Sequence, residues 1–139
     1  MILHAFTDGA SRGNPGESGI GVIVRDDLGR MVLSLNGYIG KTTNNVAEYT
    51  ALLILLQHVE KNGCTKLVVH SDSELMVRQI NGEYKVRDEG LKKLYRKTLR
   101  LLERKSFAFE LKYIPREQNR DADRLANSGI DSKKRIFTK

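Results

Sequence analysis

The order of hydrophobic periodicities restricts this chain to one class of fold. Apolar residues alternate with polar ones in three stretches, over 2–8, 19–25 and 31–39, with a loop expected over 9–16. Further along, the spacing predicts helices over 43–62, 73–81, 88–105 and 120–129, and strands over 66–71 and 107–114. The order βββαβααβα therefore predicts an α/β fold, in which a meander and βα units share one mixed five-stranded sheet with helices on both faces.

Length and composition exclude several classes of protein. The chain has 139 residues, enough to bury the core of a single domain. Its only cysteine, Cys64, excludes an internal disulfide and has no partners at zinc-binding spacing. No apolar run reaches the ~18 residues of a membrane span, and no signal peptide is visible. We therefore expect a cytoplasmic monomer without membrane contact.

The positive charge of the chain is unevenly distributed. The formal net charge is +7, and the segment 85–105 holds nine basic residues against three acidic ones. A basic protein is predisposed to bind polyanions, because binding releases counterions from them. The basic face of the helix expected over 88–105 has two interpretations: it contacts nucleic-acid phosphates, or it is an ordinary solvated face.

Acidic residues stand in otherwise apolar settings at several points of the chain. Asp8 and Asp72 lie at the ends of expected strands, and Glu48 shares a helix face with Leu52 and Leu55. A carboxylate on a buried face is costly unless something neutralises it. Because oxygen ligands suit hard divalent cations, converging carboxylates predict a Mg²⁺ site.

The fourth acidic residue of this set is ambiguous from the pattern alone. Asp123 shares a helix face with Ala126 and Ile130, which favours an inward direction. Asp121 is equally suited to the first turn of a helix, where the helix dipole favours an acid. The pattern leaves both residues open.

These segments together resemble the type 1 ribonuclease H family. The resemblance rests on Thr7-Asp8-Gly9, Asn44-Asn45-Val46-Ala47-Glu48, Ser71-Asp72-Ser73 and Ala122-Asp123-Arg124-Leu125-Ala126-Asn127, and it extends over about 2–129. It selects Asp123 as the fourth carboxylate. It also implies a ribonuclease H-like fold with strand order 3-2-1-4-5, one domain over 1–129, and a basic C-terminal tail over 130–139.

The resemblance implies a two-metal-ion reaction on the RNA strand of RNA–DNA hybrids, leaving 5′-phosphate and 3′-hydroxyl ends. Asp8 is then expected to bridge two Mg²⁺ ions, for which Mn²⁺ can substitute, with Glu48 and Asp72 toward one ion and Asp123 toward the other. Two alternatives are a nuclease of the same fold that acts on DNA or duplex RNA, and an inactive hybrid-binding module.

Small polar residues near the acids match family positions that line the minor groove of the hybrid or hold a DNA phosphate. They are Ser11, Asn14, Thr43, Asn44 and Asn45. Asn14 is equally suited to a turn, and Thr43 or Asn44 is equally suited to a helix N-cap. Neither of these roles requires a substrate.

The chain departs from the family pattern in two places. The loop before the last expected helix contains no histidine, where well-studied members have a mobile one, and Arg116 is the candidate to take its role. The segment 82–88 is short and lacks the basic, tryptophan-bearing insertion of many members. We therefore expect weak, salt-sensitive binding of the hybrid.

Overall fold

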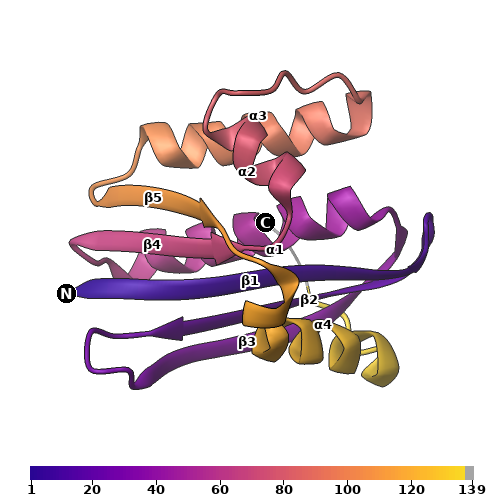
Figure 1. The fold of residues 1–139 in the computed structure, drawn as a ribbon, viewed down its shortest axis with the longest axis horizontal. Helices are drawn as coiled ribbons and strands as arrows, with labels where there is room; N and C mark the ends of the chain where they lie inside the picture. The colour runs from indigo at the N-terminus through magenta and orange to yellow at the C-terminus, as the bar shows by residue number, and fades with distance from the viewer. Residues whose placement is uncertain (137–139) are drawn as a thin grey trace.

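The computed structural model describes residues 1–136 as one sheet with helices on both of its faces (Figure 1). The element order is as expected, apart from one short 3₁₀ helix, η1. In chain order the elements are β1 (Ile2–Gly13), β2 (Gly16–Arg25), β3 (Met31–Thr42), α1 (Asn44–Asn62), β4 (Lys66–Ser71), α2 (Glu74–Ile80), α3 (Glu89–Glu103), β5 (Ala108–Tyr113), η1 (Arg116–Gln118) and α4 (Arg120–Ser132).

The sheet has the expected strand order, β3-β2-β1-β4-β5. Strands β1, β2 and β3 form an antiparallel meander, whereas β4 lies parallel to β1, and β5 lies parallel to β4. Figure 1 shows β1, β4 and β5 side by side, running in one direction. The carboxyl ends of these parallel strands therefore share one edge, where ligands gather in α/β sheets.

The prediction of a loop over 9–16 is wrong. Strands β1 and β2 continue pairing through Arg12 and Glu17 up to Gly13 and Gly16, so that only Asn14 and Pro15 form the turn. The hydrophobic pattern did not predict this part of the strand, because its residues are small or polar and show no apolar alternation. The extension places Ser11 beside the functional edge instead of on a detached loop.

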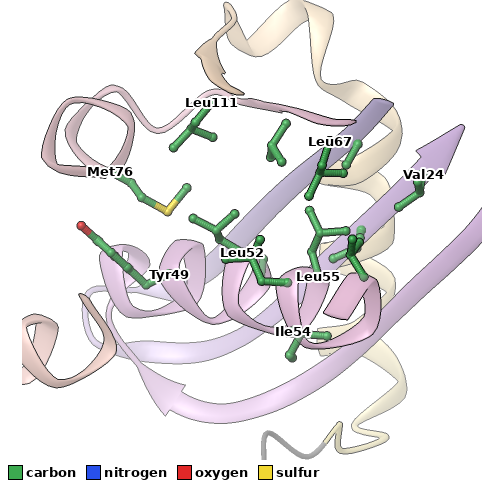
Figure 2. Packing of buried hydrophobic residues seen from close by; sticks show 14 of the residues in the cluster. Val24, Tyr49, Leu52, Ile54, Leu55, Leu67, Met76 and Leu111 are labelled. Atoms are coloured by element: carbon green, nitrogen blue, oxygen red, sulfur yellow. The ribbon is translucent and has the colours of Figure 1, made fainter. Parts of the chain in front are cut away.

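Helix α1 forms the centre of the core on one face of the sheet. Its residues Tyr49, Leu52 and Leu55 are almost fully buried. Leu52 and Leu55 lie toward Leu67 of β4, whereas Tyr49 lies beside Met76 of α2 (Figure 2). Helix α2 adds Met76 to the same cluster, and β5 adds Leu111. The helical spacing of these residues matches the periodicity seen in the sequence, and the buried stripe fixes the rotation of α1.

Helix α4 covers the other face of β1, β2 and β3 and lies very close to the strands. Added Cβ atoms would lie 2.3 Å from the Ala122 carbonyl oxygen at Gly21 and 2.5 Å from that of Ala126 at Gly19. Glycine therefore permits a backbone approach that any side chain would prevent. No helix within residues 1–136 is long and apolar enough to cross a membrane.

The last described residues continue beyond the expected helix end at residue 129. Helix α4 extends to Ser132, and its residue Ile130 is buried. The chain then forms a parallel bridge from Arg135 to Tyr38 of β3. The tail expected over 130–139 is thus partly helical and docked up to residue 136, and its residues 137–139 lie outside the described range.

Candidate active site

Asp8 and Asp72 lie at the point where β1 and β4 separate. The parallel pairing of the two strands ends at Thr7 and Ser71, and the next residue of each chain segment is an aspartate. Asp8 is only 4 % exposed. Strand pairing therefore brings the first two predicted carboxylates together at the carboxyl edge of the sheet.

Helix α1 brings Glu48 to the same edge. Thr43 caps the helix by accepting a hydrogen bond from the Val46 amide, so the helix begins just before Glu48. The Gly9 amide donates a 2.8 Å hydrogen bond to Glu48 Oε1. Glycine is required at position 9, because a Cβ there would lie 2.3 Å from the backbone carbon of Ala47. The predicted inward direction of Glu48 is confirmed, at 3 % exposure.

Carboxylate oxygens of Asp8, Glu48 and Asp72 lie within 4.8 Å of one another. Burial, followed by the negative charges of Glu48 and Asp72, raises the pKa of Asp8 to about 10. Burial and then Asp72 also hold the pKa of Glu48 well above its ordinary value. Without a bound cation, ionisation of Asp8 and Glu48 is therefore strongly opposed.

The structure separates the two candidates for the fourth carboxylate. Asp123 lines the same cavity as the other three acids and contributes to the raised pKa of Asp8. Asp121 faces a different cavity and lies 3.6 Å from Arg124 and 3.9 Å from Arg25. The position of Asp121 on α4 thus makes it a surface ion-pair residue, while Asp123 joins the acidic cluster.

The four carboxylates line an open, polar cavity of about 390 Å³. Ser11 and Asn44, two of the residues expected to contact substrate, lie on its wall. Arg116 of η1 lines it as well, in the loop where the family histidine is missing. The structure therefore brings these three predicted residues to the carboxylates.

The other expected substrate contacts lie outside the cavity wall. Asn14 Oδ1 accepts a 3.0 Å hydrogen bond from the Asn44 amide and so ties the β1–β2 turn to α1. Thr43 acts as the N-cap, which is the alternative that its sequence context left open. Asn45 is half-buried in the first turn of α1. None of these three lines the carboxylate cavity.

The donor set of the cavity fits divalent cations. Within residues 1–136 no lysine, arginine or histidine forms an ion pair with Asp8, Glu48, Asp72 or Asp123. The cluster, of which Asp8 and Glu48 are buried, thus has carboxylate oxygens in excess and no paired protein cation to neutralise them. Hard cations that prefer oxygen ligands satisfy this requirement.

Three residues with supporting roles in this site were not identified from the sequence. The Gly9 amide donates to Glu48 and orients it. Asn127 Nδ2 donates to the backbone carbonyl of Asp123 at 3.0 Å and approaches the Asp123 carboxylate at 3.4 Å. Buried Asn119 donates to the Thr7 carbonyl at 2.9 Å and so anchors α4 beside Asp8. The four-residue spacing of Asp123 and Asn127 was a usable signal, whereas the other two contacts depend on tertiary structure.

Comparison with known proteins gives a consistent picture. A family model described as reverse transcriptase-like matches residues 6–129. A bifunctional protein of Mycobacterium tuberculosis is 40 % identical over 133 residues, which are 95 % of this chain and 36 % of that protein. Ribonuclease HI of Halobacterium salinarum is 35 % identical over 130 residues, 93 % of this chain and 64 % of that protein. The chain thus spans less than two thirds of either relative.

Solved structures extend the similarity to three dimensions. The crystal structure of LC11-RNase H1 in complex with an RNA/DNA hybrid superposes with a TM-score of 0.89 at 40 % identity. The match covers 94 % of this chain and 97 % of that one. The strand order, the carboxylate geometry and these similarities agree, and the chain belongs to the type 1 ribonuclease H family.

Proposed function

We propose that this protein hydrolyses the RNA strand of RNA–DNA hybrids. The observation that carries the proposal is the convergence of Asp8, Glu48 and Asp72 within 4.8 Å, with Asp123 on the same cavity wall. The similar LC11-RNase H1 binds an RNA/DNA hybrid, which supports the choice of substrate. The products are expected to carry 5′-phosphate and 3′-hydroxyl ends.

The carboxylates of Asp8, Glu48, Asp72 and Asp123 would hold two Mg²⁺ ions, or Mn²⁺ in their place. Bound cations of this kind activate the attacking water and stabilise the leaving 3′ oxygen. The contribution of the protein is to keep the oxygens in place: the Gly9 amide donates to Glu48 Oε1, and Asn127 Nδ2 approaches Asp123 Oδ1 at 3.4 Å. No side chain needs to act as a nucleophile.

Arg116 is the cationic residue on the cavity wall. We assign it the role that a histidine has in other members of the family, through its positive charge beside the phosphate that is cleaved. A guanidinium is always charged and binds phosphate through paired hydrogen bonds. Arg116 therefore cannot shuttle a proton, and its role is limited to neutralising charge and aiding product release.

Selectivity for a hybrid requires a test for 2′-hydroxyl groups on one strand. Ser11 and Asn44 present polar groups on the cavity wall, next to the carboxylates. We assign these two residues to the RNA strand and Asn45 to the adjacent minor groove. Asn14 and Thr43 hold the strand turn and the helix start in place, and we also assign Thr43 to a DNA phosphate.

The proposal is tested by cleavage of a matched panel of substrates. The same sequence is offered as RNA–DNA hybrid, duplex DNA and duplex RNA, each end-labelled on one strand, in Mg²⁺ and in Mn²⁺. We expect cleavage of the RNA strand of the hybrid only. Equal cleavage of duplex DNA favours a general nuclease, and binding of the hybrid without cleavage in either metal favours an inactive binding module.

A catalytic domain over 1–129, a monomeric state and a cytoplasmic location stay predictions. The helix that carries Asp123 continues to Ser132, so the folded part extends beyond the expected domain end.

A further inference from the structure

Most of the excess positive charge of this protein is carried by one segment. The chain has a formal net charge of +7, and nine basic against three acidic residues lie between Lys85 and Lys105. The remainder of the chain is therefore close to neutral. Helix α3 forms most of this basic segment and is the natural place to look for a polyanion contact.

The cations of α3 form a continuous row on its outer side. Leu91 and Thr98 are buried, and Leu94 packs against the core, which fixes the inward face. The outer face presents a cationic strip at helical spacing i, i+3, i+4 and i+7. This cationic strip consists of Lys93, Arg96, Lys97 and Arg100, all exposed.

Neighbouring acids neutralise the ends of this row but not the strip itself. Lys92 lies 3.0 Å from Glu89, and Arg104 lies 3.5 Å from Glu60. Within residues 1–136 no member of the cationic strip forms an ion pair with an acidic side chain. Like charges at this spacing destabilise a helix, and a bound polyanion would relieve their repulsion.

A shallow cavity lies beside the cationic strip. It has a volume of about 220 Å³ and lies where α3 packs on α1. Lys97, Arg100 and Arg104 line it together with Leu53 and Leu101. Cationic groups therefore surround a depression into which a phosphate and its sugar can fit.

The strip is separate from the catalytic cavity. None of its four residues lines the cavity of Asp8, Glu48 and Asp72. Helix α3 packs against α1, whereas α4, which carries Asp123, covers the opposite face of the sheet (Figure 1). A ligand on the strip can therefore bind without occupying the carboxylate cavity.

We propose that the cationic strip of α3 is a second nucleic-acid contact, which binds phosphates of one strand of a duplex whose hybrid part lies in the catalytic cavity. This inference rests on the proposed function. At a rise of 1.5 Å per residue the strip is roughly 10 Å long, the axial length of about three phosphates at 3.4 Å each. Its two guanidinium groups can each bind a phosphate through paired hydrogen bonds.

The test compares two variants that each remove three positive charges. The first is Arg96→Gln, Lys97→Gln and Arg100→Gln in the strip; the control is Lys66→Gln, Lys112→Gln and Lys134→Gln, which lie outside α3. Glutamine retains helix propensity, so both variants are expected to fold. Cleavage of an 8-bp and a 24-bp hybrid is measured for both variants and the unmodified protein over a range of salt concentrations.

We expect the strip variant to raise KM for the 24-bp hybrid by about tenfold, with kcat and the 8-bp kinetics unchanged. The slope of log KM against log salt should fall by about 0.9 for each phosphate that the variant no longer binds. The control should change neither the length dependence nor the slope.

Equal effects of the two variants, or equal effects on the short and the long hybrid, would overturn the proposal. The proposal would also be overturned if an acidic polyglutamate peptide competed with the 24-bp hybrid and duplex DNA did not. The strip would then bind an acidic protein. If the unmodified protein cleaves neither hybrid, the proposed function fails instead, and binding of the 24-bp hybrid still tests the strip.

Discussion

Asp8→Asn is expected to abolish hybrid cleavage, with a decrease of more than about 10³-fold in kcat, because the variant lacks several kcal/mol of metal-dependent transition-state stabilisation. Asp8 lies among Glu48, Asp72 and Asp123, and the negative charges of all three oppose its ionisation. Asparagine retains the shape of the side chain but supplies one neutral oxygen. Single-turnover cleavage of a labelled hybrid in Mg²⁺ measures the effect.

The same substitution is expected to stabilise the metal-free protein. The folded pKa of Asp8, about 10, lies above the ordinary value of 3.8, so that the folded state retains a proton that the unfolded state has released. Asp8 therefore costs stability above about pH 4, and this cost grows as the pH rises toward 10. At pH 7 we expect Asp8→Asn to raise the free energy of unfolding by on the order of 2 kcal/mol.

Thermal unfolding between pH 5 and pH 9 in a chelator tests this second effect. The advantage of the variant should increase with pH and shrink when Mg²⁺ is added, because a cation that binds the folded wild type stabilises it. Asp121→Asn is the matched control: Asp121 is exposed, faces another cavity, and should affect neither activity nor stability by much. A variant at position 8 that retains near-normal cleavage would show that the cluster is not the catalytic site.

Gly9→Ala is expected to damage the fold and the site together. The added Cβ would lie 2.3 Å from the Ala47 carbon and 2.4 Å from the Glu48 nitrogen, both of them backbone atoms that cannot rotate away. Helix α1 must therefore shift from β1, at a cost of roughly 3 kcal/mol or more. The shift also lengthens the hydrogen bond from the Gly9 amide to Glu48, which displaces a metal-binding oxygen.

Chemical denaturation and hybrid cleavage of the same preparation measure both effects. Gly90→Ala is the control, since its Cβ approaches only the Asp88 side chain, at 3.1 Å, near the start of α3. That change should alter the free energy of unfolding by less than about 1 kcal/mol and leave cleavage intact. If Gly9→Ala unfolds like the wild type and cleaves at a normal rate, the close approach of α1 to β1 does not position Glu48.

The fold was largely predictable because the hydrophobic pattern is regular where the core is built. Leu52 and Leu55 recur at helical spacing, and their burial in α1 follows from that spacing. The segment 9–16 was predicted wrongly, because its strand is held by backbone pairing and carries no apolar alternation. The strand order came from the family resemblance, since periodicity does not reveal which strands are neighbours.

The site was predictable to the extent that side-chain direction follows from local structure. Glu48 lies on the inward face of α1, as its helical phase predicts. Asp8 shares the strand face of His4 and Phe6, and it is buried where the pairing of β1 with β4 ends. Asp121 and Asp123 could not be separated from the pattern, because the choice depends on where Arg25 and the cavity lie relative to α4. The contributions of Gly9 and Asn119 are interactions between distant segments and leave no local signal.

The most direct measurement is the position of bound metal in a crystal of the wild-type protein soaked in Mn²⁺. We expect anomalous-scattering peaks within about 2.5 Å of carboxylate oxygens of Asp8, Glu48, Asp72 and Asp123. Crystals at saturating Mn²⁺ with no peak among these four residues, or with peaks only elsewhere on the protein, would contradict the assignment of this edge as a metal-dependent nuclease site.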